Sequence, residues 1–216
     1  MVTSAVEDYL KVIYELVREE GEATTSAIAE RLDVAPASVS GMIKKLAEMR
    51  LVEHTPYRGV ILSPAGRKIA LEVIRHHRLV ELYLAEALGV PWDEVHAEAN
   101  RLEHAISPSV ADRMAAALGN PRVDPHGAPI PDKDGSIAAE PTRRLSNAVA
   151  EQRVVVAEVS DEDAALLRYL ASIGVLPGVE VEVVGRTPSG DMTVRIGDEL
   201  QTISRTTAER VFIRDS

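Results

Sequence analysis

Apolar residues recur at every third or fourth position through the start of the chain, as they do on the buried face of a helix. The segment AVEDYLKVIYELVREE shows this spacing most clearly and ends at Gly21. Two further helical segments follow: TTSAIAERLDV, which a threonine or serine caps, and VAPASVSGMIKKLAEMRLV, which begins at a proline suited to a first turn. The pattern therefore predicts three consecutive helices.

The period then changes from helical to that of strands. Two β-favouring runs, LVEH and GVILS, flank the turn formers TPYRG, and this arrangement predicts a hairpin. Three helices followed by a hairpin are the layout of a winged helix-turn-helix, whose recognition helix lies in the major groove of DNA. We therefore predict a winged helix-turn-helix DNA-binding domain over residues 1–73.

The third helix and the hairpin carry side chains suited to DNA. Small hydroxyl residues near the start of the third helix allow close approach to base edges, and two lysines further along can reach phosphates. An arginine at the hairpin tip can reach the backbone or an adjacent groove. The alternative is a helical domain with a solvated basic face. The expected DNA contacts are Thr25, Ser26, Ser38, Ser40, Lys44, Lys45 and Arg58.

The middle of the chain predicts three more helices. A long amphipathic helix runs from Pro64 to Leu88, where Gly89 and Pro91 stop it, and VPWDEVHAEANRLEHAI and PSVADRMAAALG follow. These helices have more apolar surface than a monomer needs to cover. A homodimer is therefore expected, and a dimer suits a palindromic operator.

The last third of the chain changes character twice. Residues 119 to about 152 predict a linker or extended loop, since GNPRVDPHGAPIPDKDGSIAAEP holds five of the twelve prolines. From Arg153, the runs VVVAEV, VEVEVVGR, MTVRIG and LQTIS predict strands, and DAALLRYLASIGVLPG predicts one helix. The expected fold is mainly α with small β parts. It has a helical domain at 74–142, including the linker, and a small β-barrel at 153–216.

Composition narrows the class of protein. Of the 216 residues, 45% are hydrophobic and 27% charged, as in a folded globular protein. No apolar run approaches the length of a membrane span, and the N-terminus lacks a signal-peptide pattern, so we expect a cytoplasmic protein without a membrane partner. The absence of cysteine excludes disulfides, thiolate metal sites and cysteine nucleophiles.

Charge is distributed unevenly along the chain. The formal net charge is −10, which disfavours a nonspecific architectural DNA protein. Residues 36–68, however, carry six basic and two acidic residues, whereas residues 1–35 carry three basic and eight acidic ones. A single basic segment that coincides with the third helix and hairpin indicates a focused anionic partner.

Histidines and acids gather on two consecutive helices. His77 and Glu81 lie four positions apart, so one face of the long helix can present both. Antiparallel helices that face each other with such residues build divalent-metal sites, and ligands without sulfur suit manganese, iron(II), cobalt or zinc. A solvated charged face is the alternative. The next helix adds His96, Asn100, Glu103 and His104, whereas ordinary polar roles are expected for His54, His76 and His126.

The chain resembles the diphtheria toxin repressor family of metal-activated repressors, especially its manganese-responsive members. The matching stretches are VEDYLKVIYELV, IAERLDVAPASVSGMIKKLAEMRLV, YRGVILSPAGRKIA, RHHRLVELYL, VHAEANRLEHAI and DPHGAPIP. LLRYLASIGVLPGVEVEV is similar to the SH3-like, ferrous-transport-type third domain of the long members. The resemblance covers essentially the whole chain and implies a metal-activated DNA-binding repressor, with no enzymatic activity and no small organic substrate.

The resemblance implies a primary metal site that joins the first helix to the dimerisation domain. Iron-type members have methionine and cysteine where this chain has Asp8 and Asn100, and manganese-type members have aspartate at the first position and usually glutamate at the second. Asp8 therefore points to Mn²⁺, with Fe²⁺ as the alternative and Co²⁺ or Zn²⁺ as surrogates. Asn100 departs from both patterns, because its amide brings no charge. The implied ligands are Asp8, Asn100, Glu103 and His104.

A second implied site joins the dimerisation domain to the third domain. Arg78 resembles the residue that holds an anion beside this site in the family. Lys11 stands where short manganese repressors have a glutamate, so their two-metal arrangement is not expected. The implied ligands are His77, Glu81 and His96 from the helices, with Glu158 and Asp161 from the barrel.

The expected mechanism is linkage, in which metal favours the arrangement that places two recognition helices on an operator. Three rivals use some of the same features. A metallohydrolase would need an open ligand position and a general base, and no nucleophile motif is present. A winged-helix regulator of an organic ligand would need an aromatic or apolar pocket, and aromatics are only 3%. An architectural protein would bind by charge alone.

Overall fold

The computed structural model describes residues 3–55, 59–139, 141 and 143–216. It divides into two compact units. The N-terminal unit comprises Met1–His76 and Pro131–Ser136, and the C-terminal unit comprises His77–Ile130 and Ile137–Ser216. Within the described part of the chain, no helix combines the length and apolar character needed to cross a membrane.

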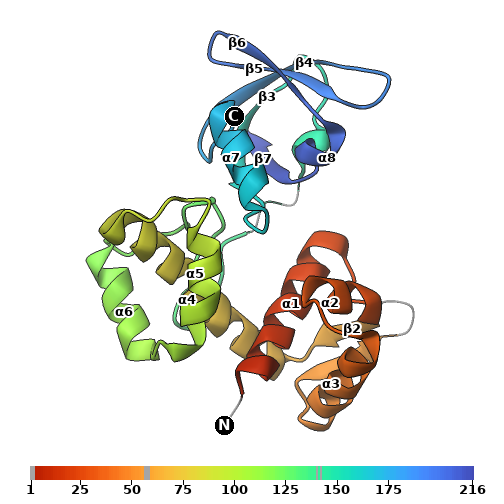
Figure 1. Cartoon of the computed structure of the whole chain (residues 1–216), viewed down its shortest axis with the longest axis vertical. Coiled ribbons are helices and arrows are strands. Elements are labelled where there is room, and N and C mark those ends of the chain that lie inside the picture. The colour runs from red at the N-terminus through yellow and green to blue at the C-terminus, as the bar shows by residue number, and fades with distance from the viewer. Residues whose placement is uncertain (1–2, 56–58, 140, 142) are drawn as a thin grey trace. The chain divides into compact units, whose positions relative to one another are not determined.

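The N-terminal unit is a winged helix-turn-helix. It contains α1 (Ser4–Glu20), α2 (Thr25–Arg31), α3 (Pro36–Glu48), the hairpin of β1 (Val52–Thr55) and β2 (Gly59–Leu62), and the start of α4 (Pro64–Leu88) (Figure 1). Gly21 ends α1 in the left-handed conformation, and the Thr24 side chain caps α2 by accepting from the Ala27 N–H. The fully buried side chains include Leu10, Ile13, Leu16, Ile28 and Leu46. This unit confirms the predicted helices and hairpin.

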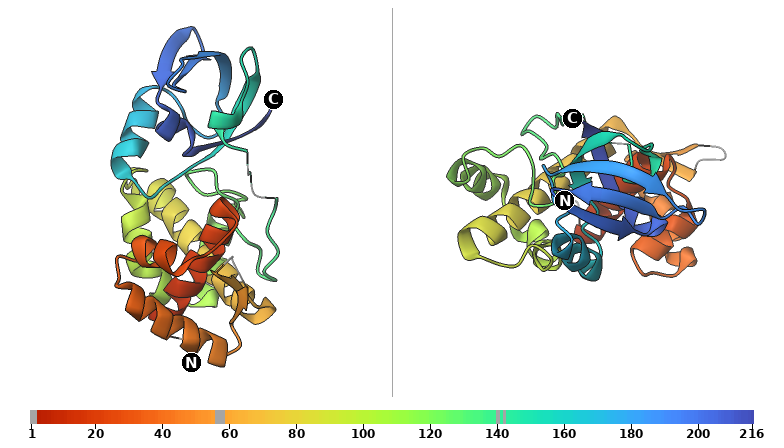
Figure 2. Two further views of the ribbon diagram at one scale, coloured as in Figure 1. Left: turned by 90° about the vertical axis from the view of Figure 1, so that its right-hand side faces the viewer. Right: turned by 90° about the horizontal axis from the view of Figure 1, so that it is seen from above.

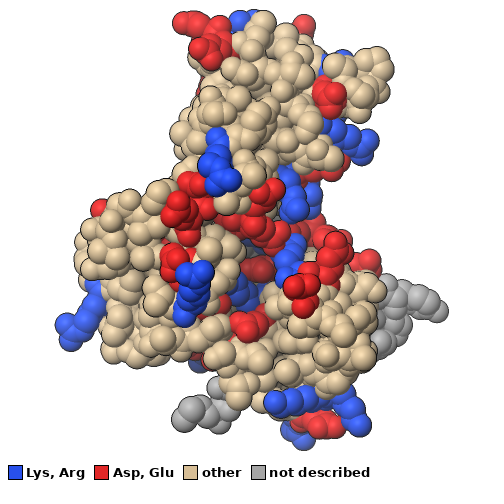
Figure 3. Space-filling model, viewed as in Figure 1, with Lys and Arg blue, Asp and Glu red and all other residues tan. Residues whose placement is uncertain are grey.

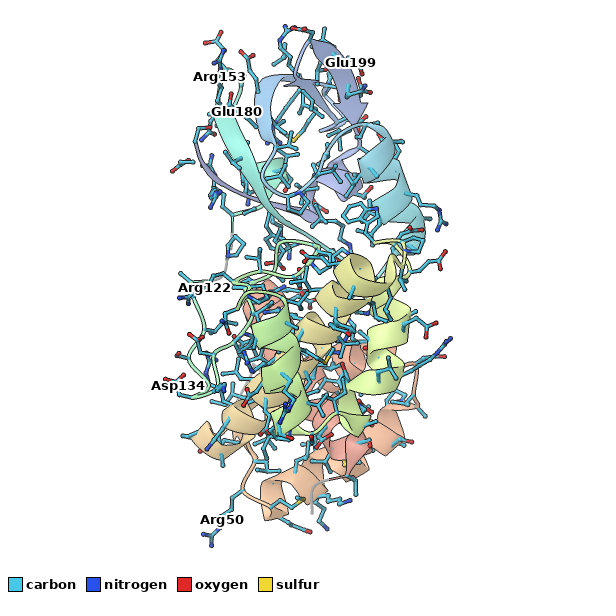
Figure 4. The ribbon with its side chains drawn as sticks, turned by 90° about the vertical axis from the view of Figure 1, so that its left-hand side faces the viewer. Arg50, Arg122, Asp134, Arg153, Glu180 and Glu199 are labelled. Atoms are coloured by element: carbon cyan, nitrogen blue, oxygen red, sulfur yellow. The ribbon has the colours of Figure 1, made fainter. Side chains whose placement is uncertain are left out.

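Helix α3, the predicted recognition helix, presents one face to solvent. Burial of Val39 and Leu46 leaves Ser38, Ser40, Lys44 and Lys45 exposed, while on α2 Ser26 is exposed and Thr25 half-buried. Lys and Arg side chains gather around the lower end of this unit, with acids among them (Figure 3), and Arg50 extends outward just after α3 (Figure 4). The DNA-contacting roles stay predictions. Arg58 and the side chain of His54 lie outside the described residues.

The helical part of the C-terminal unit comprises the second half of α4, α5 (Val95–Leu102) and α6 (Pro108–Ala117). The sequence predicts one helix through Ile106, but the chain tightens at its end into the 3₁₀ turn η1 (Glu103–Ala105). Small apolar clusters hold these helices together. One contains Val80, Leu84, Val95 and Ala99, and the other contains Leu79, Leu82, Ala111, Ala115 and Ile130.

The rest of the C-terminal unit is a small, strongly curved sheet (Figure 2). Its antiparallel order is β6–β5–β4–β3–β7, built from β3 (Arg153–Val159), β4 (Glu180–Arg186), β5 (Met192–Ile196), β6 (Glu199–Ile203) and β7 (Val211–Asp215). The predicted barrel is confirmed, but the sequence analysis missed β7, whose run VFIRD is short. The helices η2 (Leu145–Asn147), α7 (Ala164–Ser172) and α8 (Arg205–Ala208) complete the unit. The charged Arg153, Glu180 and Glu199 lie on its outside (Figure 4).

The segment predicted as a linker is irregular, but part of it is tightly packed. Asp124, His126, Ala128 and Ile130 are all buried. The carbonyl of His126 accepts from the Val159 N–H at 3.0 Å, so the segment lies against β3. Gly127 makes this approach possible: its φ is +91°, and an added Cβ would lie 2.1 Å from the Ala157 carbonyl oxygen. The packing therefore fixes where Asp124 and His126 point.

We expect Gly127→Ala to destabilise the C-terminal unit by more than about 2 kcal/mol, because the methyl group meets backbone that cannot move aside and the φ is strained. Gly178→Ala is the control, since Gly178 has a similar φ of +87° with open space around its Cβ. It should cost only about 1 kcal/mol. The measurement is the urea midpoint followed by tryptophan emission. Equal midpoints for the two variants would show that the close approach is not a constraint.

Candidate metal centre

The two helices that carry the predicted ligands bring them together. On α4, His77 and Glu81 are one turn apart, with His77 Nε2 2.9 Å from Glu81 Oε1. His96 of α5 faces both, and its Nδ1 lies 3.1 Å from His77 Nε2 and 3.1 Å from Glu81 Oε1. The i, i+4 spacing on α4 and the short connection to α5 therefore produce the cluster that the sequence suggests.

The barrel adds one carboxylate to this cluster. Asp161, between β3 and α7, places its Oδ2 3.2 Å from His96 Nδ1. One possible ligand atom from each of His77, Glu81, His96 and Asp161 lies within 4.8 Å of every other. Glu158 is buried on β3, beyond a register shift, but it does not belong to this group. The ligand roles of all five residues stay predictions.

Asp124 and His126 also reach the cluster, and the sequence analysis missed both. Glu81, Asp124 and His126 form a second group within the same 4.8 Å limit, so Glu81 is shared by the two groups. His126 Nδ1 lies 3.7 Å from Glu81 Oε2 and 3.9 Å from Asp161 Oδ2. The expectation that His126 is an ordinary polar residue is wrong, because the residue is fully buried among carboxylates.

A local signal for this geometry exists in the DPHG sequence. Asp124 Oδ1 accepts from the backbone N–H groups of His126 and Ala128, at 2.8 and 3.0 Å. Aspartate commonly folds a turn over its own carboxylate in this way. The turn leaves Asp124 Oδ2 and the His126 ring to face the cluster.

Each of two histidines is oriented by an acceptor on its far side. His77 Nδ1 lies 2.5 Å from Glu103 Oε2, and His126 Nε2 lies 2.8 Å from the Trp92 carbonyl oxygen. The carboxylate and the carbonyl can only accept, so these ring nitrogens carry the proton. The other nitrogen of each ring faces the cluster, as in metal-ligating histidines, and would have to lose any proton it carries before it could coordinate.

The cluster also contains polar atoms that the described part of the chain leaves unsatisfied. Glu81 Oε2, Asp124 Oδ2 and His126 Nδ1 are buried without a hydrogen-bond partner. Buried polar atoms are ordinarily paired, and those without a partner call for an unseen ion or water. Carboxylate and imidazole donors of this number fit a divalent cation.

Neighbouring charges shift the pKa values of the side chains in the cluster. Although burial disfavours their charged forms, Asp161 and Glu81 raise the pKa of His96 to about 11, and Glu81 with Asp161 raises that of His126 to about 9. His96 in turn holds the pKa of Asp161 below its usual range. Burial and the charge of Glu81 raise the pKa of Asp124 to about 7, against the attraction of Arg78. At neutral pH, protons on the histidines therefore supply the positive charge that a cation would bring.

Arg78 sits beside the cluster but already has partners. It donates to the Pro129 carbonyl, and its Nε lies 3.6 Å from Asp124 Oδ2. A carboxylate of the chain itself thus faces the guanidinium where the resemblance implies an external anion. The anion-binding role stays a prediction.

The residues of the implied primary site are divided between the two units. Asp8 is half-buried on α1 of the N-terminal unit. In the C-terminal unit Asn100 is exposed, Glu103 is buried, and His104 Nε2 lies 3.4 Å from Glu103 Oε1. A site that joins Asp8 to the other three stays a prediction from sequence.

A winged helix-turn-helix together with a buried carboxylate–histidine cluster defines the class of metal-responsive DNA-binding regulators. Family models match almost the whole chain. They are the iron-dependent repressor N-terminal DNA-binding domain over residues 1–60, its metal-binding and dimerisation domain over 63–132, and the FeoA domain over 143–215. The chain belongs to the iron-dependent repressor family of metal-dependent transcriptional repressors, as the sequence motifs indicate.

Individual relatives support this assignment along the full length. The iron-dependent repressor IdeR of Mycobacterium tuberculosis is 34% identical over 98% of this chain and 97% of its own. The diphtheria toxin repressor of Corynebacterium diphtheriae is 32% identical over 86% of each chain. The solved structure of a manganese-dependent transcriptional repressor in complex with manganese has a TM-score of 0.90 and 36% identity, and covers 98% of this chain and 100% of that one. The family uses divalent metals, and its relatives differ in which one.

We expect divalent-ion binding to release roughly one to two protons per ion at pH 7, because His96 and His126 are protonated there and must lose their protons to coordinate. Affinity should therefore rise as the pH increases from 7 toward 9. Calorimetry in two buffers with different ionisation enthalpies measures the release, and His126→Gln should reduce it by about one proton. Binding without proton release at pH 7 would contradict this account of the cluster.

Proposed function

We propose that the protein is a Mn²⁺-activated transcriptional repressor that binds a palindromic operator as a homodimer in the cytoplasm and controls metal-homeostasis genes. The observation that carries the proposal is a set of buried atoms without a hydrogen-bond partner, on Glu81, Asp124 and His126, next to His77, His96 and Asp161. A resident divalent cation would satisfy these atoms together. The winged helix supplies the DNA-reading surface to which binding is coupled.

The donor set supports manganese. Three carboxylates, from Glu81, Asp124 and Asp161, converge with imidazoles, and the clustered side chains contain no sulfur. Oxygen-rich sets of this kind suit Mn²⁺ better than softer ions. Asp8 adds an oxygen donor to the implied primary site, and a similar solved structure is a manganese-dependent repressor. Fe²⁺ is the alternative, since relatives that match along the full length are named iron-dependent.

The coupling follows from where the donors originate. His77, His96 and Asp161 come from α4, α5 and the barrel, so a cation held by all three favours one arrangement of these elements. The implied primary site would extend the same effect to α1 through Asp8. Coupling of this kind is reciprocal, so operator DNA should tighten Mn²⁺ binding by the same factor by which Mn²⁺ tightens DNA binding.

The direct test is an operator titration at fixed salt with Mn²⁺, Fe²⁺, Co²⁺ or Zn²⁺, using a duplex selected from a random pool by the Mn²⁺-loaded protein. Mn²⁺ should give tight binding that a chelator reverses. Glu81→Gln should raise the Mn²⁺ concentration for half-maximal binding at least about tenfold, because it weakens a donor shared by both groups. Glu94→Gln is the control, an exposed residue just before α5. Metal-free protein that holds the duplex as tightly as the loaded form would refute the proposal.

A second variant tests the choice of ion. Asp8→Met replaces a proposed oxygen donor with a sulfur donor, so the ratio of Mn²⁺ to Fe²⁺ needed for half-maximal operator binding should move about tenfold toward Fe²⁺. Glu7→Met, at the neighbouring position on α1, is the matched control and should leave the ratio unchanged. If the ratio does not move in Asp8→Met, position 8 has no part in ion selection.

A further inference from the structure

Trp92, the single tryptophan of the chain, connects the helical part of the C-terminal unit to the barrel. It lies in the turn between α4 and α5, and its half-buried side chain packs against the apolar core of the barrel. The next residue, Asp93, accepts from Arg168 of α7 at 2.8 Å. The turn is therefore attached to the barrel by one apolar and one ionic contact in succession.

Trp92 also contacts the candidate metal centre, and it does so through His126. Its carbonyl oxygen accepts from His126 Nε2 at 2.8 Å, and its indole stacks on the imidazole with the ring centroids 5.5 Å apart and the planes inclined at 27°. One ring face and one nitrogen of His126 are thus held by Trp92. Nδ1 is left as the nitrogen that faces Glu81 and Asp161.

We propose that Trp92 is a positioning residue that presents His126 to the cation and couples occupation of the centre to the seating of the barrel on the α4–α5 turn. This inference rests on the proposed function. A ring that moves to coordinate an ion through Nδ1 must slide against the indole and pull on its carbonyl partner. The indole is itself embedded in the barrel core, so the two events share one side chain.

Intrinsic fluorescence tests the connection directly, because all indole emission comes from Trp92. The chelator-treated wild-type protein is titrated with Mn²⁺ alone and, separately, with Zn²⁺ alone. Mn²⁺ is paramagnetic and can quench emission from a distance, so Zn²⁺ reports the rearrangement of the ring pair by itself. Both ions should change the emission, with saturation at the stoichiometry that calorimetry gives.

Variants separate positioning from packing. Trp92→Leu keeps an apolar contact but removes the stacked ring, and it should weaken Mn²⁺ binding by about tenfold. Trp92→Phe restores an aromatic face and should bind Mn²⁺ within about threefold of wild type. Ile173→Ala is the control for packing, because Ile173 rests on the same barrel core. It should lower the thermal midpoint without changing Mn²⁺ affinity.

The outcomes distinguish this inference from the function on which it rests. Weakened binding in Trp92→Leu, recovery in Trp92→Phe and an emission change with Zn²⁺ support it. Wild-type Mn²⁺ affinity in Trp92→Leu, with a loss of thermal stability like that of Ile173→Ala, shows that Trp92 only packs and overturns the inference while the metal centre stands. If calorimetry detects no Mn²⁺ binding that Glu81→Gln weakens, both this inference and the proposed function are overturned.

Discussion

In the C-terminal unit several carboxylates lie so close together that positive charge must balance them. Glu81, Asp124 and Asp161 converge with three imidazoles, and most of these groups are buried. An isolated carboxylate in such surroundings costs several kcal/mol unless a positive charge accompanies it. Without metal, protons on His96 and His126 provide that charge, helped by Arg78 beside Asp124. A divalent cation bound here would therefore compete with these protons for the same negative charge.

The same cluster links the barrel to the helical part of the unit. Asp161 comes from the barrel, whereas its partners come from α4, α5 and the irregular segment that contains His126. A cation coordinated by all of these side chains would therefore need the barrel to stay in place. The contacts of Gly127 with β3 and of Asp93 with Arg168 hold the backbone close enough for the side chains to converge. Structure around the centre thus serves to keep the donors together when mutual repulsion would separate them.

Periodicity in the sequence predicted the candidate ligands that lie on regular helices, but the sequence analysis missed those in the irregular segment. Helical spacing placed His77 and Glu81 on one face, and a short connection placed His96 opposite them; the structure brings all three together. Asp161 came from a family resemblance, and it also lies in the cluster. Asp124 and His126 were missed because a proline-rich stretch indicates a linker and carries no periodicity. Their positions depend on a turn over Asp124 and on a glycine against β3, which are tertiary facts. Glu158, which also came from the resemblance, is buried on β3 next to a register shift and lies outside the group around Glu81, so its ligand role stays a prediction.

The two carboxylate oxygens of Glu103 each lie near a different histidine. One oxygen lies 2.5 Å from His77 Nδ1 and the other lies 3.4 Å from His104 Nε2, so one carboxylate contacts a histidine from each of the two implied sites. When His77 donates to Glu103 through Nδ1, its Nε2 faces Glu81 at 2.9 Å, and the bond to Nδ1 restricts the rotamer of Glu103. A fixed rotamer also fixes the second oxygen, which faces His104. The protonation of His77 therefore affects the position of the Glu103 oxygen that faces His104, and this one side chain contacts a histidine of each implied site.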